Sequence, residues 1–538
     1  MTDAADPNVD PQPAVAPTGT GPYSWYVLFV LVLVYVFNFV DRQILSILNE
    51  DIKADLGLSD AHMGFLFGTA FAMFYAIFGI PLGRFADIWV RKNMISIGLM
   101  FWSLMTVLSG TAKGFGSLAA YRIGVGIGES SASPAAFSML GDYFPPRLRA
   151  TAVAIYSSGV YIGAGVGMLI GGQVVERWNY AFPIAAEAPF GLVGWQAAFF
   201  AVGLPGLLLT LWVWTLKEPQ RGQSEGLRAP DKHPHPFREL ARELAAVIPP
   251  FTIYTLHRDR GMPAAVQNLV LAAACALVAT LLTMTIGSPE QWIALGIGGY
   301  AFLSWVQGVR FRDRATFGMI YGCRTMMFGL AGFAFCAFVT YGAGYWTAPF
   351  LIRVHGQSMA TVGNLLGMTA IAAGLLGITL GGICSDWLKV RTPRARLYCG
   401  LVTSIGSVPF ALVLFTTAHV NVAYVCNFFF TMFSSFWIGS AIAHSNELVI
   451  PRMRGIASAN FLLMGTFIGL ALGPFTIGRI STSLEAGGMV AGEALRAGIL
   501  CGLGAYVLAT LFLLIAMRTV AEDEGNRLER ARALGETV

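Results

Sequence analysis

The sequence predicts an all-α polytopic membrane protein, and three observations carry that prediction. Hydrophobic residues make up 55% of the 538 residues and charged residues only 12%, about half the charged share of a soluble domain. A membrane-spanning helix needs about 20 mostly apolar residues, and the chain contains fourteen such segments. Glycine, which is more frequent in membrane helices than in soluble ones, accounts for 62 residues. This composition argues against a disordered chain, a nucleic-acid-binding protein and an ordinary soluble enzyme.

The fourteen expected spans follow the apolar segments in chain order. They cover residues 24–48, 62–83, 94–112, 117–141, 151–174, 194–216, 264–287, 291–309, 325–350, 359–385, 397–416, 420–446, 455–478 and 497–517. Residues 1–22 contain aspartates and prolines but no Lys or Arg. We therefore expect a disordered cytoplasmic tail there and not a signal peptide.

Lys and Arg predict the orientation, because they concentrate in cytoplasmic loops. With the amino terminus in the cytoplasm, 27 of the 35 Lys and Arg lie on the cytoplasmic side. Six fall outside and two inside spans, namely Lys53, Lys113, Arg177, Arg353, Arg479 and Arg496, and Arg42 and Arg122. Both termini are expected in the cytoplasm, and the protein in the cell (inner) membrane.

The chain repeats itself weakly, which divides it into two six-span halves. The segment from Gly83 to Lys92 resembles the one from Gly382 to Arg391, at an offset of 299, and a second matching pair of segments, at 146–154 and 451–459, has an offset of 305. Internal duplication of this kind is common in transporters. The expected domains are a tail (1–22), an N-terminal six-helix bundle (23–216), a cytoplasmic linker (217–263), an inserted transmembrane hairpin (264–310), a second linker (311–324), a C-terminal six-helix bundle (325–518) and a tail (519–538). The alternative for the hairpin, that it lies on the cytoplasmic membrane face, is less favoured because neither segment has a charged face.

The repeated Gly-x-x-x-Asp-x-x-x-Arg-Lys segment resembles the signature motif of the major facilitator superfamily. We expect it to form a latch on the cytoplasmic side: Asp87 would cap a helix start in the other half, and Arg84 or Arg91 would pair with Asp142. The expected gate residues are Gly83, Arg84, Asp87, Arg91, Asp142 and Arg149, with Asp386 and Glu447 in matching places of the second half. The alternative is that these basic residues serve only topology.

Four charged residues stand out inside expected spans: Asp41 and Arg42 in the first, Arg122 and Glu129 in the fourth. Such residues are costly in a bilayer and mark function by default. Arg122 and Glu129 are seven residues apart, so they share one helix face about 10 Å apart. Each acid then has a basic neighbour on the other helix. The alternative is an ion network that only pins the two spans together.

The stretches around these charges, with Asp142 to Arg147 and Ile155 to Gly163, resemble the spinster branch of the superfamily. That resemblance implies a proton-coupled carrier of lysolipid or sphingolipid-like substrates, driven by the proton gradient, with no cofactor. It implies Asp41 and Glu129 as protonatable groups and Arg42 and Arg122 as partners for them or for an anionic head group. We also expect substrate contacts from Ser130, Ser131, Ser133 and Tyr341.

Other functions remain as alternatives. The anion:cation symporter branch also has an Asp-Arg pair in its first span, so a proton-coupled sugar-acid or organic-anion carrier is the second possibility, and a receptor on the same fold is a third. An ATP-driven pump, a channel and a membrane enzyme form a further class of alternatives. No phosphate-binding Gly-x-x-x-x-Gly-Lys-Ser/Thr loop occurs and no Ser-His-Asp arrangement recurs at matched depth, so an enzyme is not expected. The seven cysteines show no CxxC spacing, so no metal site is expected. His444, near the end of its span, is either a packing residue or a proton relay. The expected partners are a small-molecule or lipid substrate, protons and membrane lipids, and the expected state is a monomer.

Overall fold

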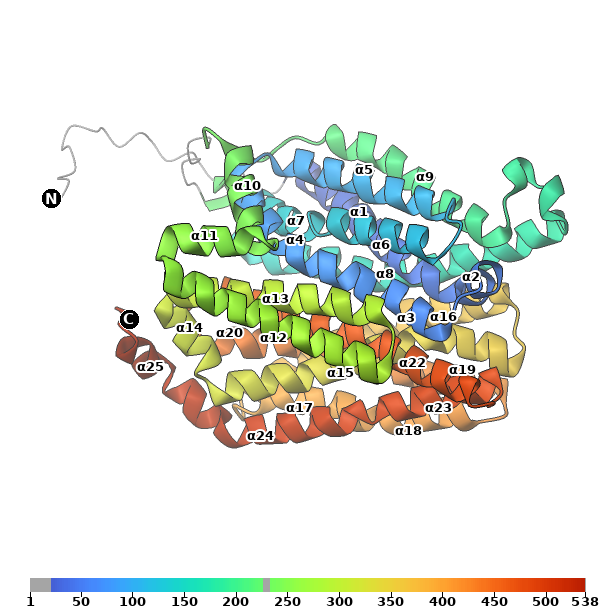
Figure 1. The fold of residues 1–538 in the computed structure, drawn as a ribbon. Coiled ribbons are helices and arrows are strands. Elements are labelled where there is room, and N and C mark those ends of the chain that lie inside the picture. Colours follow the sequence, from blue (N-terminus) through green and yellow to red (C-terminus); the bar gives the residue numbers. More distant parts are fainter. Residues whose placement is uncertain (1–20, 226–232, 538) are drawn as a thin grey trace.

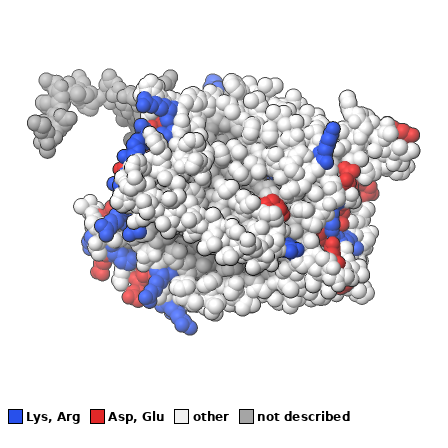
Figure 2. All heavy atoms as spheres, viewed as in Figure 1, with Lys and Arg blue, Asp and Glu red and all other residues white. Residues whose placement is uncertain are grey.

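Helices make up most of the chain that the structure describes, and no strand occurs in that part of the chain. The computed structural model describes residues 21–225 and 233–537, so most of the expected N-terminal tail lies outside the described residues. Twelve helical segments of the described chain are long and apolar enough to cross a membrane. On the face that Figure 2 shows, most charged side chains gather at the two ends and only a few lie in the band between them. The predicted all-α, multi-pass class is confirmed.

The first bundle contains nine helices, several of which begin where the local sequence favours a helix start. Pro22 and Pro146 occupy first turns, where proline is well tolerated, and Ser59 caps a helix by accepting a hydrogen bond from the His62 amide (3.2 Å). The helices are α1 (Pro22–Ile47), α2 (Asn49–Leu56), α3 (Asp60–Phe67), α4 (Thr69–Ile88), α5 (Arg91–Ser109), α6 (Phe115–Glu129), α7 (Ala132–Tyr143), α8 (Pro146–Ala181) and α9 (Gly194–Trp214).

The second bundle follows the same plan with more interruptions. Two of its spans contain π-helical segments, η4 (Val402–Gly406) and η6 (Gly465–Ala471). Its helices are α15 (Arg324–His355), α16 (Met359–Lys389), α17 (Ala395–Leu401), α18 (Val408–Thr416), α19 (Val420–Ser434), α20 (Trp437–Glu447), α21 (Arg454–Met464), α22 (Leu472–Ala486), α23 (Ala491–Leu503), α24 (Ala505–Gly525) and α25 (Arg527–Ala533).

The count of fourteen spans stays a prediction. The expected spans at 94–112 and 117–141 correspond to α5 and to the pair α6–α7, which are not among the twelve qualifying segments. Helix α6 has 15 residues and α7 has 12, so neither is long enough alone to cross a bilayer. Helices α6 and α7 pack within the first bundle, because both contact α5, which in turn contacts α9.

The inserted block is more structured than a linker and a hairpin. Its helices are α10 (Pro236–Val247), α11 (Phe251–Arg260), α12 (Met262–Ile286), α13 (Pro289–Arg312) and α14 (Arg314–Tyr321). Helices α10 and α11 occupy part of the stretch predicted as a polar linker. The hairpin α12–α13 runs alongside the bundles and not across one end (Figure 1). Helix α13 packs against α4, α10 and η6, whereas α12 packs on α13 and α11.

A polar cluster fixes the two hairpin helices to each other. The Asn268 side chain, fully buried on α12, donates to Ser304 Oγ (2.9 Å) and Gln307 Oε1 (2.8 Å) and accepts from the Tyr300 hydroxyl (2.5 Å). Buried polar groups of this kind stabilise a structure only when they are satisfied. The cluster therefore sets the register of α12 on α13.

The two bundles touch at one end and separate at the other. We call the end that carries the start of α1 and α25 the terminal face, and the other end the opposite face. Near the opposite face a Cβ on Gly64 would lie 2.5 Å from the Pro474 carbonyl oxygen, so the backbones of α3 and α22 meet at a distance that only glycine allows. Asn49 donates to the Tyr345 hydroxyl (2.6 Å) across the same boundary. A cavity of about 890 Å³ lies nearer the terminal face, lined by both bundles and by the inserted block.

Candidate functional site

The four intramembrane charges come together between α1 and α6, as their helical spacing predicts. Arg42 Nε on α1 donates to Glu129 Oε2 on α6 at 2.8 Å. The Glu129 side chain is fully buried and that of Arg42 is 14% exposed. The guanidinium carbon of Arg42 also lies 4.3 Å from the ring centre of Phe71, 4.7 Å from that of Phe39 and 4.9 Å from that of Tyr75. Such cation–π contacts stabilise a desolvated arginine, and the sequence analysis did not identify these rings.

Asp41 and Arg122 lie close together without forming an ion pair. Arg122 Nη1 donates to the backbone carbonyl of Asp41 (3.0 Å). Both carboxylate oxygens of Asp41 are buried, and no described residue reaches them with hydrogen-bond geometry, although Thr106 and Trp102 lie beside that carboxylate. Nε and Nη2 of Arg122 are likewise buried without a hydrogen-bond partner among the described residues. Two acid–base contacts were expected between these helices. Arg42 and Glu129 form a direct ion pair, whereas Arg122 contacts only the backbone carbonyl of Asp41 and not its carboxylate.

The expected substrate-contact residues divide into two groups. Ser130 and Ser133 line the cavity together with Tyr75, whose ring faces Arg42. Ser131 instead donates to the Gly128 carbonyl (2.8 Å) and packs on Gly98 of α5. Tyr341 is partly buried in α15 and is not among the residues that line the cavity. The floor of the cavity thus adjoins the Arg42–Glu129 pair.

Arg91, Asp142 and Arg149, three of the expected gate residues, form their contacts within the first half and with the start of the inserted block. The buried Arg91 guanidinium forms an ion pair with Asp142 and donates to Glu218 Oε1 (2.8 Å). Arg149 pairs with Glu225 (2.8 Å). Glu218 and Glu225 lie at the start of the inserted block, where the sequence analysis assigned no role.

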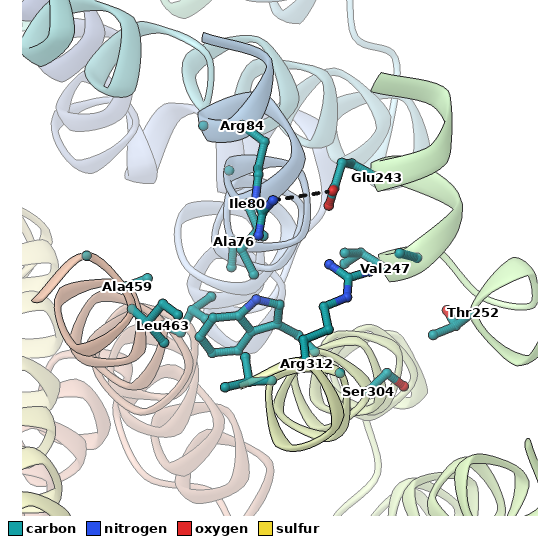
Figure 3. A pocket seen from close by; sticks show the side chains of 18 of the residues that line it. Ala76, Ile80, Arg84, Glu243, Val247, Thr252, Ser304, Arg312, Ala459 and Leu463 are labelled. Carbon is teal, nitrogen blue, oxygen red and sulfur yellow. Dashed lines mark ion pairs between the residues drawn. The ribbon is translucent and has the colours of Figure 1, made fainter. Parts of the chain in front are cut away.

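Three expected gate residues, Gly83, Arg84 and Asp87, line the cavity. Arg84 on α4 lies 3.8 Å from Glu243 on α10 (Figure 3). Asp87 makes no hydrogen bond or ion pair with a described residue; it lines the cavity, as does Gly455 of α21 in the other half. The expected capping of a helix in the other half by Asp87 is therefore not made in this cavity-open arrangement. That contact remains a prediction for the closed one.

The second half repeats this arrangement through an arginine that the motif comparison missed. Arg396 pairs with Asp386 (2.5 Å) and with Glu447 (2.9 Å). Arg396 is 305 residues after Arg91, the same offset that separates Glu447 from Asp142. The change of offset from 299 to 305 was the signal that could have identified it, because the loop of the second copy is six residues longer. Arg391, at the end of the motif copy, lies over the Trp387 ring instead (3.8 Å).

The opposite face carries an ion network that the sequence analysis did not predict. Arg353 on α15 donates to both oxygens of Asp60 on α3 (2.8 and 3.0 Å) and to Glu50 on α2 (2.7 Å). Lys53 also reaches Asp60 (2.7 Å), whose side chain is fully buried. Glu485 on α22 lies 3.5 Å from Arg353. The network joins the two bundles across the end at which they touch.

Two further expectations concern single residues and metals. His444 is buried against Gly329 and Phe333, with Nε2 3.5 Å from the Thr325 carbonyl, a packing position away from the charge cluster. Within the described ranges, no group of three or more His, Cys, Asp or Glu is placed to hold a metal ion.

Comparison with known proteins agrees with this architecture. Residues 31–474 match the family model of the Major Facilitator Superfamily. An MFS-type efflux pump of Mycolicibacterium smegmatis is 25% identical over 88% of this chain and 88% of its own length. Protein spinster of Drosophila melanogaster is 24% identical over 88% of this chain but only 65% of its own length, so the chain spans less than two thirds of that relative. A probable galactarate/D-glucarate transporter of Escherichia coli (strain K12) is 24% identical over 85% of this chain and 86% of its own length.

A solved structure extends the comparison. It is a bacterial homologue of the human lysosomal transporter spinster, in an inward-facing and occupied conformation. It superposes with a TM-score of 0.68 at 26% identity, and the match covers 94% of this chain and 99% of that one. The predicted resemblance to spinster proteins is confirmed. With a family model that spans most of its length and the two-bundle fold of that family, this chain belongs to the major facilitator superfamily.

Proposed function

We propose that this chain is a proton-coupled secondary active transporter that works by alternating access. The observation that carries the proposal is the buried cluster of Asp41, Arg42, Arg122 and Glu129, which adjoins the floor of a cavity lying between the bundles. A merely structural ion network would pair its members, but among the described residues the Asp41 carboxylate has no ion-pair partner and part of the Arg122 guanidinium has no hydrogen-bond partner. Unsatisfied buried charge is costly, so its retention supports a working role.

Protonation is the event that this arrangement would use. A buried carboxylate without a partner costs free energy that binding a proton removes. Glu129 in contrast accepts from Arg42, so protonation of Glu129 would release that arginine from its counter-ion. The Arg42 guanidinium, then without its counter-ion, would lie next to the cavity, because the Tyr75 ring that it contacts is part of the cavity lining. Binding of a proton to Glu129 would in this way change whether Arg42 is available to interact with a charged substrate.

The two ends of the molecule supply the alternation. The Arg353 network and the α3–α22 contact close the opposite face, while Asp87 lines the cavity and makes no ion pair or hydrogen bond with the second bundle among the described residues. We place the terminal face in the cytoplasm and the protein in the inner membrane, on the basis of the Lys and Arg distribution. The arrangement is then open to the cytoplasm. Closure of the cavity at the terminal face would bring Asp87 to the second bundle, and opening of the opposite face would break the Arg353 network.

The substrate favoured by the cavity is an amphiphile of the lysolipid or sphingolipid type. The lining combines apolar side chains such as Ile80, Val247 and Leu463 with arginines, which fits an apolar body with a charged group. Similarity to spinster proteins supports this class. The second candidate is a sugar acid or other organic anion, favoured by the likeness to the probable galactarate/D-glucarate transporter.

Reconstitution of the purified protein into liposomes tests the proposal. Uptake of a lysolipid and of a sugar acid is followed with and without a pH gradient, and counterflow at equal pH distinguishes a carrier from a receptor. We expect counterflow of the lysolipid and its acceleration or accumulation by the gradient. Counterflow of the sugar acid alone would support the second candidate, and no counterflow of any solute would refute transport.

A further inference from the structure

The inserted block forms one wall of the cavity, although the family's two-bundle plan does not require it. Helix α10 contributes Val247, α11 contributes Thr252, and α13 contributes Ser304 and Trp305 to the lining. Figure 3 shows side chains of α10 and α13 facing those of α4 and α21 across the same space. Because α13 packs on α4 and η6, the hairpin closes the side of the cavity between the two bundles.

The arginines that line this cavity differ in whether they have a carboxylate partner. Four of them are paired, namely Arg84 with Glu243, Arg242 with Glu239, Arg258 with Asp259, and Arg452 with Asp313. Arg260 and Arg312 have no carboxylate within ion-pair distance among the described residues. Arg260 donates to the backbone carbonyl of Phe311 (2.9 Å), which places it beside Arg312. Arg312 makes no hydrogen bond or ion pair with any described residue, and it projects from the end of α13 toward α10 (Figure 3).

The position of these two guanidinium groups fits one class of ligand. They lie at the edge of a space whose walls carry Ile80, Val247, Trp305 and Leu463, so an apolar body inside the space would leave its polar end beside them. Arginine binds phosphate and carboxylate through charge-assisted, often bidentate hydrogen bonds. Asp259 is an acid that competes for Arg312, because its charge acts on that arginine, but Arg258 already pairs with it at 2.8 Å.

We propose that the inserted block supplies the head-group site of the transporter: Arg260 and Arg312 bind the anionic group of a single-chain amphiphile while α4, α10, α13 and α21 enclose its apolar part. This inference rests on the proposed transport function and names the charge of its substrate. It also gives the insertion a direct role in binding.

Arg310 provides a matched control on the same helix. It is two residues from Arg312, which turns it about 200° around the helix axis. Like Arg312 it is exposed, and it lacks a carboxylate partner among the described residues, but it lines a separate groove beside Phe317. Loss of Arg310 removes the same charge from the same helix end without touching the cavity.

The test measures equilibrium binding to the full-length protein in nanodiscs, using tryptophan fluorescence with isothermal titration as a second readout. The probes are oleoyl lysophosphatidic acid, the neutral monoolein and inorganic phosphate, and the variants are Arg312→Gln, Arg312→Lys, Arg260→Gln and Arg310→Gln. Losing one charge-assisted hydrogen bond predicts lysophosphatidic acid binding weaker by about tenfold or more in Arg312→Gln and Arg260→Gln. We expect a smaller loss in Arg312→Lys, no change in Arg310→Gln, and unchanged monoolein binding throughout.

Three results would overturn the inference. These are wild-type affinity for lysophosphatidic acid in Arg312→Gln, an equal loss in Arg310→Gln, and Arg312-dependent binding of inorganic phosphate as tight as that of the lipid, which would indicate a plain anion site. Flux separates this inference from the proposed function. Arg312-dependent binding without any transport would refute the transport proposal alone, and transport of the lipid indifferent to Arg312 would refute the head-group site alone.

Discussion

Replacing Arg353 with Gln should open the opposite face. Arg353 donates to both Asp60 oxygens and to Glu50, and its side chain is only 10% exposed. Removing one partner of a buried ion pair costs about 3–5 kcal/mol. Because Asp60 and Arg353 lie in different bundles, most of that cost falls on the arrangement in which the bundles touch. Lys53 stays on Asp60, so we take the low end, about 3 kcal/mol.

The population change follows from that magnitude. Moving an equilibrium from 99:1 to 1:99 takes about 5.5 kcal/mol, so about 3 kcal/mol would bring a 99:1 population close to 1:1. Spin labels at Thr111 in the first bundle and Met489 in the second, both exposed at the opposite face, would report the distance between bundles by double electron–electron resonance. We expect a second, longer distance in Arg353→Gln.

Arg496→Gln is the control for this experiment. Arg496 pairs with Glu493 on its own helix α23 (2.6 Å), so its loss removes an arginine from the same face without cutting a contact between bundles. An unchanged distance distribution in Arg353→Gln, or the same shift in Arg496→Gln, would refute the reasoning that the network holds this face closed.

Three further predictions concern the insertion and its surroundings. A cysteine at Ser288, in the turn of the hairpin, should react with an impermeant thiol reagent added outside intact cells; labelling only from the cytoplasmic side would contradict the fourteen-span topology. Asn268→Leu removes the polar cluster that joins α12 to α13, leaving buried partners unsatisfied at about 1–3 kcal/mol, and should lower the thermal stability of the protein in detergent; an unchanged melting temperature would show that the cluster is dispensable. Hydrogen bonds from Arg452 lower the pKa of Asp313 to about 2, so its stabilising contribution should be full above the ordinary pKa of about 3.9 and vanish as pH falls toward 2. The stability difference between wild type and Arg452→Gln should shrink over that interval, and a constant difference would exclude this pair as its source.

Local patterns in the sequence were enough to predict the helices and the central charge pair. Hydropathy located nearly every helix that runs through the molecule, because the length of a bilayer-spanning helix constrains each segment separately. The approach of Arg42 to Glu129 followed from helical spacing and from the cost of isolated charge in a membrane.

Contacts between distant segments were not predictable in this way. The Arg353 network joins α2, α3, α15 and α22, and no local pattern links residues about 300 positions apart. Only the packed helices show that Glu129 has an ion-pair partner whereas the Asp41 carboxylate has none among the described residues. Helices α10 and α11 were missed because a charged, proline-containing stretch resembles a linker in sequence, and only the structure shows that α10 packs against α4 and α11 against α12.

The central claim, that protonation of the buried acids drives transport, is tested most directly by flux through Glu129→Gln and Asp41→Asn in proteoliposomes. The substrate is the one that the wild-type protein exchanges, measured as pH-gradient-driven flux and, in parallel, as counterflow at equal pH. Both substitutions mimic the protonated side chain and cannot release a proton, so the account predicts that gradient-driven flux is lost while counterflow persists. Full gradient-driven flux in both variants would contradict the account and leave the four charges a structural role.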